Sequence, residues 1–271
     1  MKNVIALTAA IALLTAPFTT AYAAVSVSGS TSVSNVVEVL AETYQKSSRH
    51  NVDVQGTGSS SGILAAKNGT SMIGMSSREL RPDEAAPDTQ QLVIARDGIA
   101  LIVNNNNPVE SLTREQIKRI YRKEITNWQE VGGDNKAIVV VTRDASSGTR
   151  EAFEKILGLK RRVNGIPVTS ISAAAQVANG NGMVKTLVAN NDYAISYISL
   201  GSVDDNLLKS LKVDNVEASE KNILSGQYSI ARPFILLFKN ELDPQAADFI
   251  RYIMSDTGQS IVAEQGYIRV N

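Results

Sequence analysis

Small hydroxyl residues and glycines gather in three segments of this chain, each directly after an expected strand and directly before an expected helix. The segments are residues 28–32, 56–62 and 143–149. A helix start leaves backbone N–H groups without partners and carries a partial positive charge, so each segment can contribute to an anion site. Ser, Thr and Gly are also favoured helix caps, and capping alone explains any single segment. Three segments with the same placement favour a shared binding site.

The third segment also carries Arg143, whose guanidinium offers several N–H donors in one plane. Hydroxyls, backbone amides and one arginine suit a dehydrated tetrahedral anion, because each buried oxygen needs donors and the buried charge needs compensation. A nucleophilic serine would need a base, and the only histidine, His50, lies in a polar turn. One histidine and no cysteine make no transition-metal ligand set. We therefore expect a binding protein rather than an enzyme, without metal or cofactor.

Short β-branched runs alternate with helical patterns along the chain, which is typical of an α/β fold with mostly parallel sheets. Strands are expected at residues 25–28, 51–55, 137–142, 193–199 and 229–239, and helices at 33–44, 60–67, 113–121, 148–157 and 244–254. In such a sheet, ligands bind beyond the carboxyl ends of the strands, where the three segments would meet. Residues 92–94 and 98–103 form an apolar, strand-like stretch that is the candidate hinge.

The first 23 residues have the features of a cleaved secretory signal. Lys2 precedes an apolar run over residues 4–14, and Ala21-Tyr22-Ala23 forms a cleavage site. The run is too short for a membrane-spanning helix. Of the 27 basic and 27 acidic side chains, removal of the signal costs only Lys2, and this balance argues against nucleic-acid binding. The absence of cysteine excludes a lipid-modified cysteine, so we expect a free periplasmic protein.

The chain resembles the periplasmic phosphate-binding proteins of bacterial phosphate ABC transporters, within the type II solute-binding superfamily. The likeness covers nearly the whole chain after the signal, and its most specific parts are residues 28–31, 56–62, 73–78, 125–128 with 131–133, and 143–149. The resemblance implies a two-lobe α/β fold with a ligand cleft between the lobes. Lobe 1 would comprise residues 24–100 and 200–271, and lobe 2 residues 101–199. A monomer would capture inorganic phosphate and deliver it to the membrane permease subunits of the transporter.

The same resemblance implies which residues hold the anion. Hydroxyls and backbone amides of the three segments would surround it, with Arg143 supplying the positive charge. The expected phosphate ligands are Ser30, Thr31, Ser32, Ser59, Ser60, Ser77, Arg143, Ser147, Gly148 and Thr149.

Ser77 departs from the pattern of the well-known family members, which carry an aspartate there that accepts a proton from the ligand. Phosphate carries a proton near neutral pH and sulfate does not, so an obligatory acceptor rejects sulfate. A serine hydroxyl can either accept or donate. Another tetrahedral oxyanion, such as sulfate or molybdate, therefore stays an alternative ligand, and a secreted phosphomonoesterase is a less favoured alternative function.

Two further side chains are expected to have structural roles. Arg78 could be a second positive group at the site, but pairing with Glu79 or Asp83 at the surface is the favoured interpretation. Trp128 is the only tryptophan, and its apolar surroundings predict that it packs in the core of lobe 2.

Overall fold

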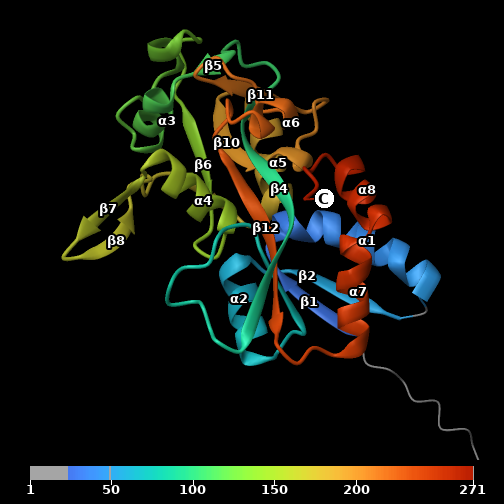
Figure 1. The fold of residues 1–271 in the computed structure, drawn as a ribbon. Helices are drawn as coiled ribbons and strands as arrows, with labels where there is room; N and C mark the ends of the chain where they lie inside the picture. Colours follow the sequence, from blue (N-terminus) through green and yellow to red (C-terminus); the bar gives the residue numbers. More distant parts are fainter. Residues whose placement is uncertain (1–23, 49, 271) are drawn as a thin grey trace, which may run out of the picture.

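Two hydrophobic cores divide the molecule into two lobes, which Figure 1 shows one above the other. The core of lobe 1 comes from residues 25–95 and 234–267. The core of lobe 2 comes from residues 99–230. The architecture is therefore the two-lobe α/β arrangement that the sequence predicts, with each lobe supplying its own buried apolar centre.

The computed structural model describes residues 24–48 and 50–270. The expected signal over residues 1–23 lies outside this described part. Within the described part, no helix combines the length and the apolar character that crossing a bilayer demands.

Lobe 1 is built around three parallel strands with helices on both faces. The buried positions of the first helix, among them Val33, Val36 and Leu40, recur at helical spacing and face the sheet. Along the last strand, Phe234 and Leu236 belong to one core cluster, while Ile235 and Leu237 pack in another on the opposite face. The elements of lobe 1 are β1 (Val25–Gly29), α1 (Thr31–Ser48), β2 (Val52–Gly56), α2 (Ser59–Asn68), β3 (Ile73–Ser76), α7 (Pro244–Met254) and α8 (Asp256–Glu264).

Lobe 2 likewise contains three neighbouring strands that run parallel. Trp128 is buried in its core and donates its indole N–H to the backbone oxygen of Tyr193, which confirms the predicted packing role. The elements of lobe 2 are β5 (Ser111–Leu112), α3 (Arg114–Tyr121), β6 (Val139–Arg143), α4 (Gly148–Leu157), β7 (Lys160–Val163), β8 (Ile166–Thr169), β9 (Gln176–Ala178), α5 (Gly180–Ala189), β10 (Ala194–Ser199), β11 (Leu208–Val213) and α6 (Glu220–Leu224). The β7–β8 hairpin projects away from the rest of the molecule (Figure 1).

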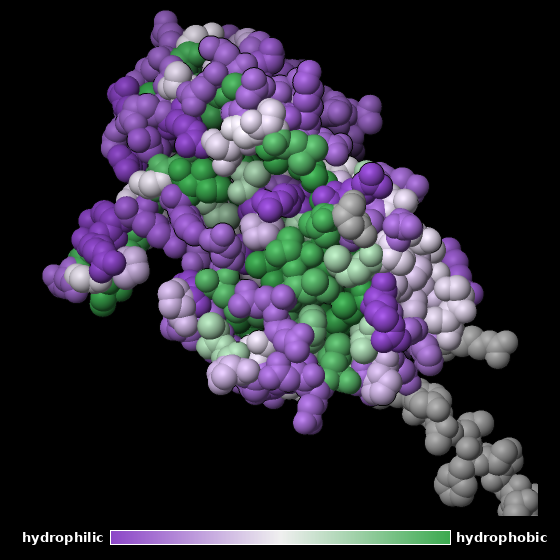
Figure 2. Space-filling view, viewed as in Figure 1, coloured by the Kyte–Doolittle hydropathy of each residue, from purple (hydrophilic) through white to green (hydrophobic). Residues whose placement is uncertain are grey.

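Two long antiparallel strands run from one lobe into the other. They are β4 (Thr89–Asn104) and β12 (Ala231–Lys239). Both belong to a sheet with the order β2-β1-β3-β12-β4-β10-β6-β9. The strands β2, β1 and β3 of lobe 1 are parallel, as are β10, β6 and β9 of lobe 2. In contrast, β12 is antiparallel to β3, and β4 is antiparallel to both β12 and β10. The sheet is thus mixed rather than mostly parallel as predicted, because β4 leads the chain out of lobe 1 and β12 leads it back. Figure 2 shows apolar surface where β4 and β12 pass along lobe 1.

The chain returns from lobe 2 into lobe 1 later than the sequence predicts, as judged from the residues that form each core. The expected return is at residue 200, yet Leu208, Leu211 and Tyr228 are buried in the core of lobe 2. β11 also pairs with the lobe 2 end of β4, with Leu211 opposite Leu101. We therefore propose lobe boundaries near residues 98 and 231, where the two strands cross.

A candidate anion-binding site between the lobes

The three hydroxyl-rich segments meet between the lobes at the start of α1, α2 and α4. Ser32 Oγ of lobe 1 lies 3.0 Å from Thr149 Oγ1 of lobe 2. Ser59 Oγ lies 3.3 Å from Ser77 Oγ, and Gly148 packs directly against Ser59. A Cβ atom added to Gly148 would lie 2.2 Å from Ser59 Oγ, so a side chain there would collide with lobe 1. Helix starts from both lobes thus face one small volume, as the sequence predicts.

Two of the expected ligand hydroxyls cap the helices that they precede. Ser30 Oγ accepts hydrogen bonds from the backbone N–H groups of Ser32 and Val33 at the start of α1. Ser147 Oγ accepts from the backbone N–H of Arg150 at the start of α4. This capping fixes where each helix begins and therefore where its remaining N–H groups point.

Arg143 is buried at the end of β6 and reaches across the cleft. Its Nη2 donates to Thr31 Oγ1 of lobe 1 at 3.0 Å, and its Nη1 donates to Asn181 Oδ1 at 2.9 Å. Asp144 is its carboxylate neighbour, 3.9 Å away and partly exposed. Burial lowers the pKa of Arg143, but arginine keeps its charge in proteins. The hydroxyl of Tyr197, whose pKa burial raises to about 12, accepts from the Arg143 backbone N–H.

Ser60 and Ser77, the other two lobe 1 hydroxyls in the expected set, have different surroundings. The backbone N–H of Ser77 donates to Ser59 Oγ at 3.1 Å, so Ser77 lies within the cluster. Ser60 Oγ instead accepts from Arg78 Nη2 at 3.2 Å, while its backbone N–H donates to the Ser146 oxygen of lobe 2. Ser60 therefore contributes to the contact between the lobes.

The surface role expected for Arg78 is wrong. The residue is only 3% exposed, and its guanidinium pairs with Glu84 at 2.6 Å and with Glu151 of lobe 2 at 2.8 Å. Burial alone lowers the pKa of Arg78, but the hydrogen bond to Glu84 and the charge of Glu151 raise it overall. Sequence proximity suggested Glu79 and Asp83, whereas a partner from the other lobe can be identified only from the fold.

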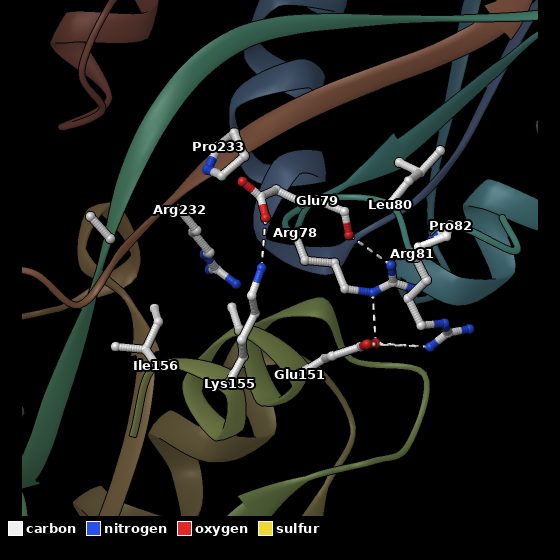
Figure 3. A pocket seen from close by; sticks show the side chains of 12 residues that line it. Arg78, Glu79, Leu80, Arg81, Pro82, Glu151, Lys155, Ile156, Arg232 and Pro233 are labelled. Atoms are coloured by element: carbon white, nitrogen blue, oxygen red, sulfur yellow. Dashed lines mark hydrogen bonds and ion pairs between the residues drawn. The ribbon is translucent and has the colours of Figure 1, made fainter. Parts of the chain in front are cut away.

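A pocket of about 400 Å³ lies beside this ion pair, between the loop after β3, helix α4 and the start of β12 (Figure 3). Figure 3 shows Glu151 reaching from α4 toward Arg78 and Arg81, and Lys155 reaching toward Glu79. A second opening, also about 400 Å³, exposes the Arg143 side of the cleft. The hydroxyl cluster therefore lies between two openings of the interlobe cleft.

The sequence-based set lacks Arg232 and Asp97, which lie at the site. Arg232 Nη1 donates to Thr149 Oγ1 at 2.7 Å and to Ser77 Oγ at 3.1 Å. Its other nitrogens bind the Asp97 carboxylate, which is likewise buried. A signal was present in the sequence, because each residue is a charge that directly adjoins a long apolar run. Such a charge needs a buried partner.

Asn181 is another addition, supplied by a fourth helix start. Its side-chain amide donates to Ser32 Oγ at 3.2 Å and to Ser202 Oγ at 3.1 Å, while its carbonyl oxygen accepts from Arg143. The run Asn-Gly-Asn-Gly over residues 179–182, between β9 and α5, marks a turn before a helix and could have identified it.

The arrangement can hold an anion but offers little for bond breaking. Hydroxyls, helix N–H groups and two guanidiniums surround the volume, and Asp97 is already engaged by Arg232. Among residues 24–48 and 50–270, no three His, Cys, Asp or Glu side chains gather as a metal site would require.

Comparison with known proteins agrees with this description. A family model described as a PBP superfamily domain matches residues 15–257. The phosphate-binding protein PstS of Borreliella burgdorferi is 31% identical over 255 residues, which cover 91% of this chain and 90% of that protein. PstS of Bacillus subtilis is 30% identical over 250 residues, covering 90% of this chain and 80% of that protein.

Solved structures extend the likeness to three dimensions. A Clostridium perfringens protein solved with bound phosphate has a TM-score of 0.86 and 43% identity, over 92% of this chain and 100% of that chain. An ABC-type phosphate transport receptor from Vibrio cholerae has a TM-score of 0.75 and 41% identity, over 91% of this chain and 100% of that chain. The chain thus belongs to the PBP superfamily and, within it, to the family of the phosphate-binding proteins PstS.

Proposed function

We propose that this protein captures inorganic phosphate between its two lobes in the periplasm and delivers it to the permease subunits of an ABC-type importer. The observation that carries the proposal is the convergence of three helix starts and the buried Arg143 on one interlobe volume. Each element supplies donors or positive charge, which an oxyanion stripped of water requires. The family supports the same ligand, since its members are phosphate-binding proteins by name.

The proposed phosphate ligands are the hydroxyls and helix N–H groups of the cluster together with Arg143. Ser32, Ser59 and Thr149 hydrogen-bond to, or pack against, partners across the cleft, and each hydroxyl can turn to donate to an anion. Closure would follow from the ligand's greater affinity for the state in which both lobes contact it. We expect the protein to act as a monomer, because all of these groups come from one chain.

Sulfate or molybdate is the second candidate ligand, and the observation that favours it is the hydroxyl at Ser77. The Ser77 hydroxyl accepts a hydrogen bond from Arg232. Because residue 77 is a serine, no carboxylate at this position demands a proton from the ligand. A phosphomonoesterase is disfavoured, because relatives in the family are binding proteins and transport receptors.

Isothermal titration of the ligand-stripped protein, residues 24–271, tests the proposal. Phosphate should bind, and Arg143→Gln should weaken binding by about a hundredfold or more, since it removes a buried charge that faces the anion. Arg161→Gln is the matched control, because Arg161 lies exposed on the β7–β8 hairpin and should leave affinity unchanged. Wild-type protein that binds sulfate or molybdate but no phosphate would make the second candidate the function.

A further inference from the structure

Arg232 and Asp97 form a buried ion pair at the point where the two crossing strands meet. They lie opposite each other in the register of β12 and β4. Their side chains are 2% and 0% exposed, and the shortest distance between their charged atoms is 2.9 Å. Burial lowers the pKa of Arg232 and raises that of Asp97, with each partner opposing the other's shift. A pair this costly to bury needs a reason beyond strand packing.

One guanidinium nitrogen of Arg232, Nη1, faces the interlobe cleft rather than Asp97. Asp97 Oδ2 accepts from Nε at 3.1 Å and from Nη2 at 2.9 Å, so one face of the guanidinium is occupied. Nη1 points the other way and donates to Ser77 of lobe 1 and Thr149 of lobe 2. These two residues belong to the proposed phosphate ligands. Asp97 thus fixes a charged donor at the junction of both lobes.

Arg232 is also close enough to Arg143 to affect it electrostatically. Burial lowers the pKa of Arg143, and the charge of Arg232 lowers it further. Two guanidiniums at one buried volume repel each other unless an anion lies between them. Asp97 compensates the charge of Arg232 on one side, and an anion in the cleft would separate the two guanidiniums on the other.

We propose that Arg232 binds the oxyanion through Nη1, as a second guanidinium opposite Arg143, and that Asp97 positions it. This inference rests on the proposed function of the site as a phosphate receptor. Because arginine only donates, Nη1 would take an unprotonated oxygen of the ligand. The site thereby gains a charged hydrogen-bond donor beside Ser77.

Titration of phosphate into two variants tests this role. Arg232→Gln should weaken binding by about tenfold to a hundredfold, the worth of a hydrogen bond to a charged group. Because this variant leaves Asp97 buried without its cation, it is also expected to be less stable. The double variant Arg232→Met, Asp97→Leu replaces the whole pair with apolar side chains of similar size, which folded proteins often tolerate. It should fold and show the same loss of affinity.

Arg96→Gln is the matched control, since Arg96 is an exposed arginine next to Asp97 in the same strand. Its affinity should equal that of the wild type. The phosphorus NMR resonance of bound phosphate adds a readout that a purely structural role would not move. Arg232→Lys keeps the positive charge but changes the group that contacts the anion. The phosphorus resonance should therefore shift in this variant.

The outcomes separate the two proposals. Wild-type protein that fails to bind phosphate would overturn the proposed function itself. Phosphate binding by wild type that persists undiminished in the folded double variant would overturn only the role of Arg232. An unshifted resonance in Arg232→Lys would likewise mean that Arg232 joins the lobes without touching the anion.

Discussion

Gly148 brings the backbone of lobe 2 against a side chain of lobe 1. A Cβ atom there would lie 2.2 Å from Ser59 Oγ and 2.8 Å from Ser77 Oγ, which are far below van der Waals contact. The residue does not have a positive φ, so its backbone would accept another side chain. The need for glycine at this position therefore comes from the closeness of the lobes.

Gly148→Ala should weaken phosphate binding at least tenfold, or about 1.4 kcal/mol, because the lobes cannot close to the same distance. The unfolding midpoint of the ligand-free protein should change little, since Gly148 lies within α4, where alanine has a higher helix propensity than glycine. Titration and thermal unfolding measure the two effects.

Gly182→Ala provides the control for this substitution. Gly182 also lies near a helix start, in α5, but an added Cβ would meet nothing within 4 Å. Its affinity should be that of the wild type. Equal affinities of Gly148→Ala and Gly182→Ala would show that lobe approach at residue 148 does not matter for binding.

The loop after β3 is organised around one buried carboxylate, Glu84. Glu84 accepts from both terminal nitrogens of Arg78, at 2.6 and 2.7 Å, and from the backbone N–H of Arg81 at 2.8 Å. Burial alone raises the pKa of Glu84, but these hydrogen bonds and the arginine charges lower it overall, below the usual 4.5. The loop thus holds Arg78 in position beside Ser60 and lobe 2.

Glu84→Gln should lower the free energy of unfolding by about 3 kcal/mol at pH 7, because it leaves Arg78 without its main buried partner. A lowered folded-state pKa stabilises the protein above the unfolded value near 4.5, and this contribution is lost as pH falls through the folded pKa. The difference between wild type and variant should therefore be full at neutral pH and shrink below pH 4.5.

Chemical denaturation at a series of pH values measures this difference. Glu79→Gln is the control, because Glu79 and its partner Lys155 are about 70% exposed and exposed pairs contribute little. A stability difference for Glu84→Gln that stays constant below pH 4.5 would contradict the role assigned to its carboxylate.

Helices with a clear periodicity of apolar residues were predictable from the sequence. The pairing of elements that are distant in the sequence was not. The helix expected at 148–157 is α4 with the same bounds, and the expected helix over 244–254 is α7. The β7–β8 hairpin escaped prediction because its first strand, Lys-Arg-Arg-Val, is exposed on both faces and shows no alternation. The antiparallel crossing of β4 and β12 also depends on contacts between segments over a hundred residues apart.

The same distinction holds for the site. The hydroxyl segments were visible because strand, turn and helix follow each other locally, and local order decides where a helix begins. Arg232, Asp97 and Asn181 were missed because they join the cluster through tertiary packing. Charges that adjoin long apolar runs, such as the first two, are the signal to use in related sequences.

The whole molecule is held closed by contacts of two kinds. The hydroxyl cluster joins the lobes at the centre, and ion pairs join them at the edge of the pocket in Figure 3. Glu151 of lobe 2 is the centre of these pairs, with Arg78 at 2.8 Å and Arg81 at 3.1 Å in lobe 1. We expect the crossing strands β4 and β12 to act as the hinge, since both continue from one core into the other.

Glu151→Gln should shift the equilibrium between the open and closed forms of the ligand-free protein toward the open form. The Glu151 side chain is 18% exposed and Arg78 is 4% exposed, so the loss occurs in a partly desolvated setting where a charge pair matters more than at the surface. Lys155→Gln, on the same helix, breaks only the exposed pair with Glu79 and serves as the control.

Small-angle scattering of ligand-free protein should give a larger radius of gyration for Glu151→Gln than for Lys155→Gln. Phosphate affinity should fall about tenfold in Glu151→Gln alone, because the ligand must then supply the free energy of closure. If both variants match the wild type in radius and affinity, these ion pairs accompany closure without favouring it, and the hydroxyl cluster with its two arginines must hold the lobes together.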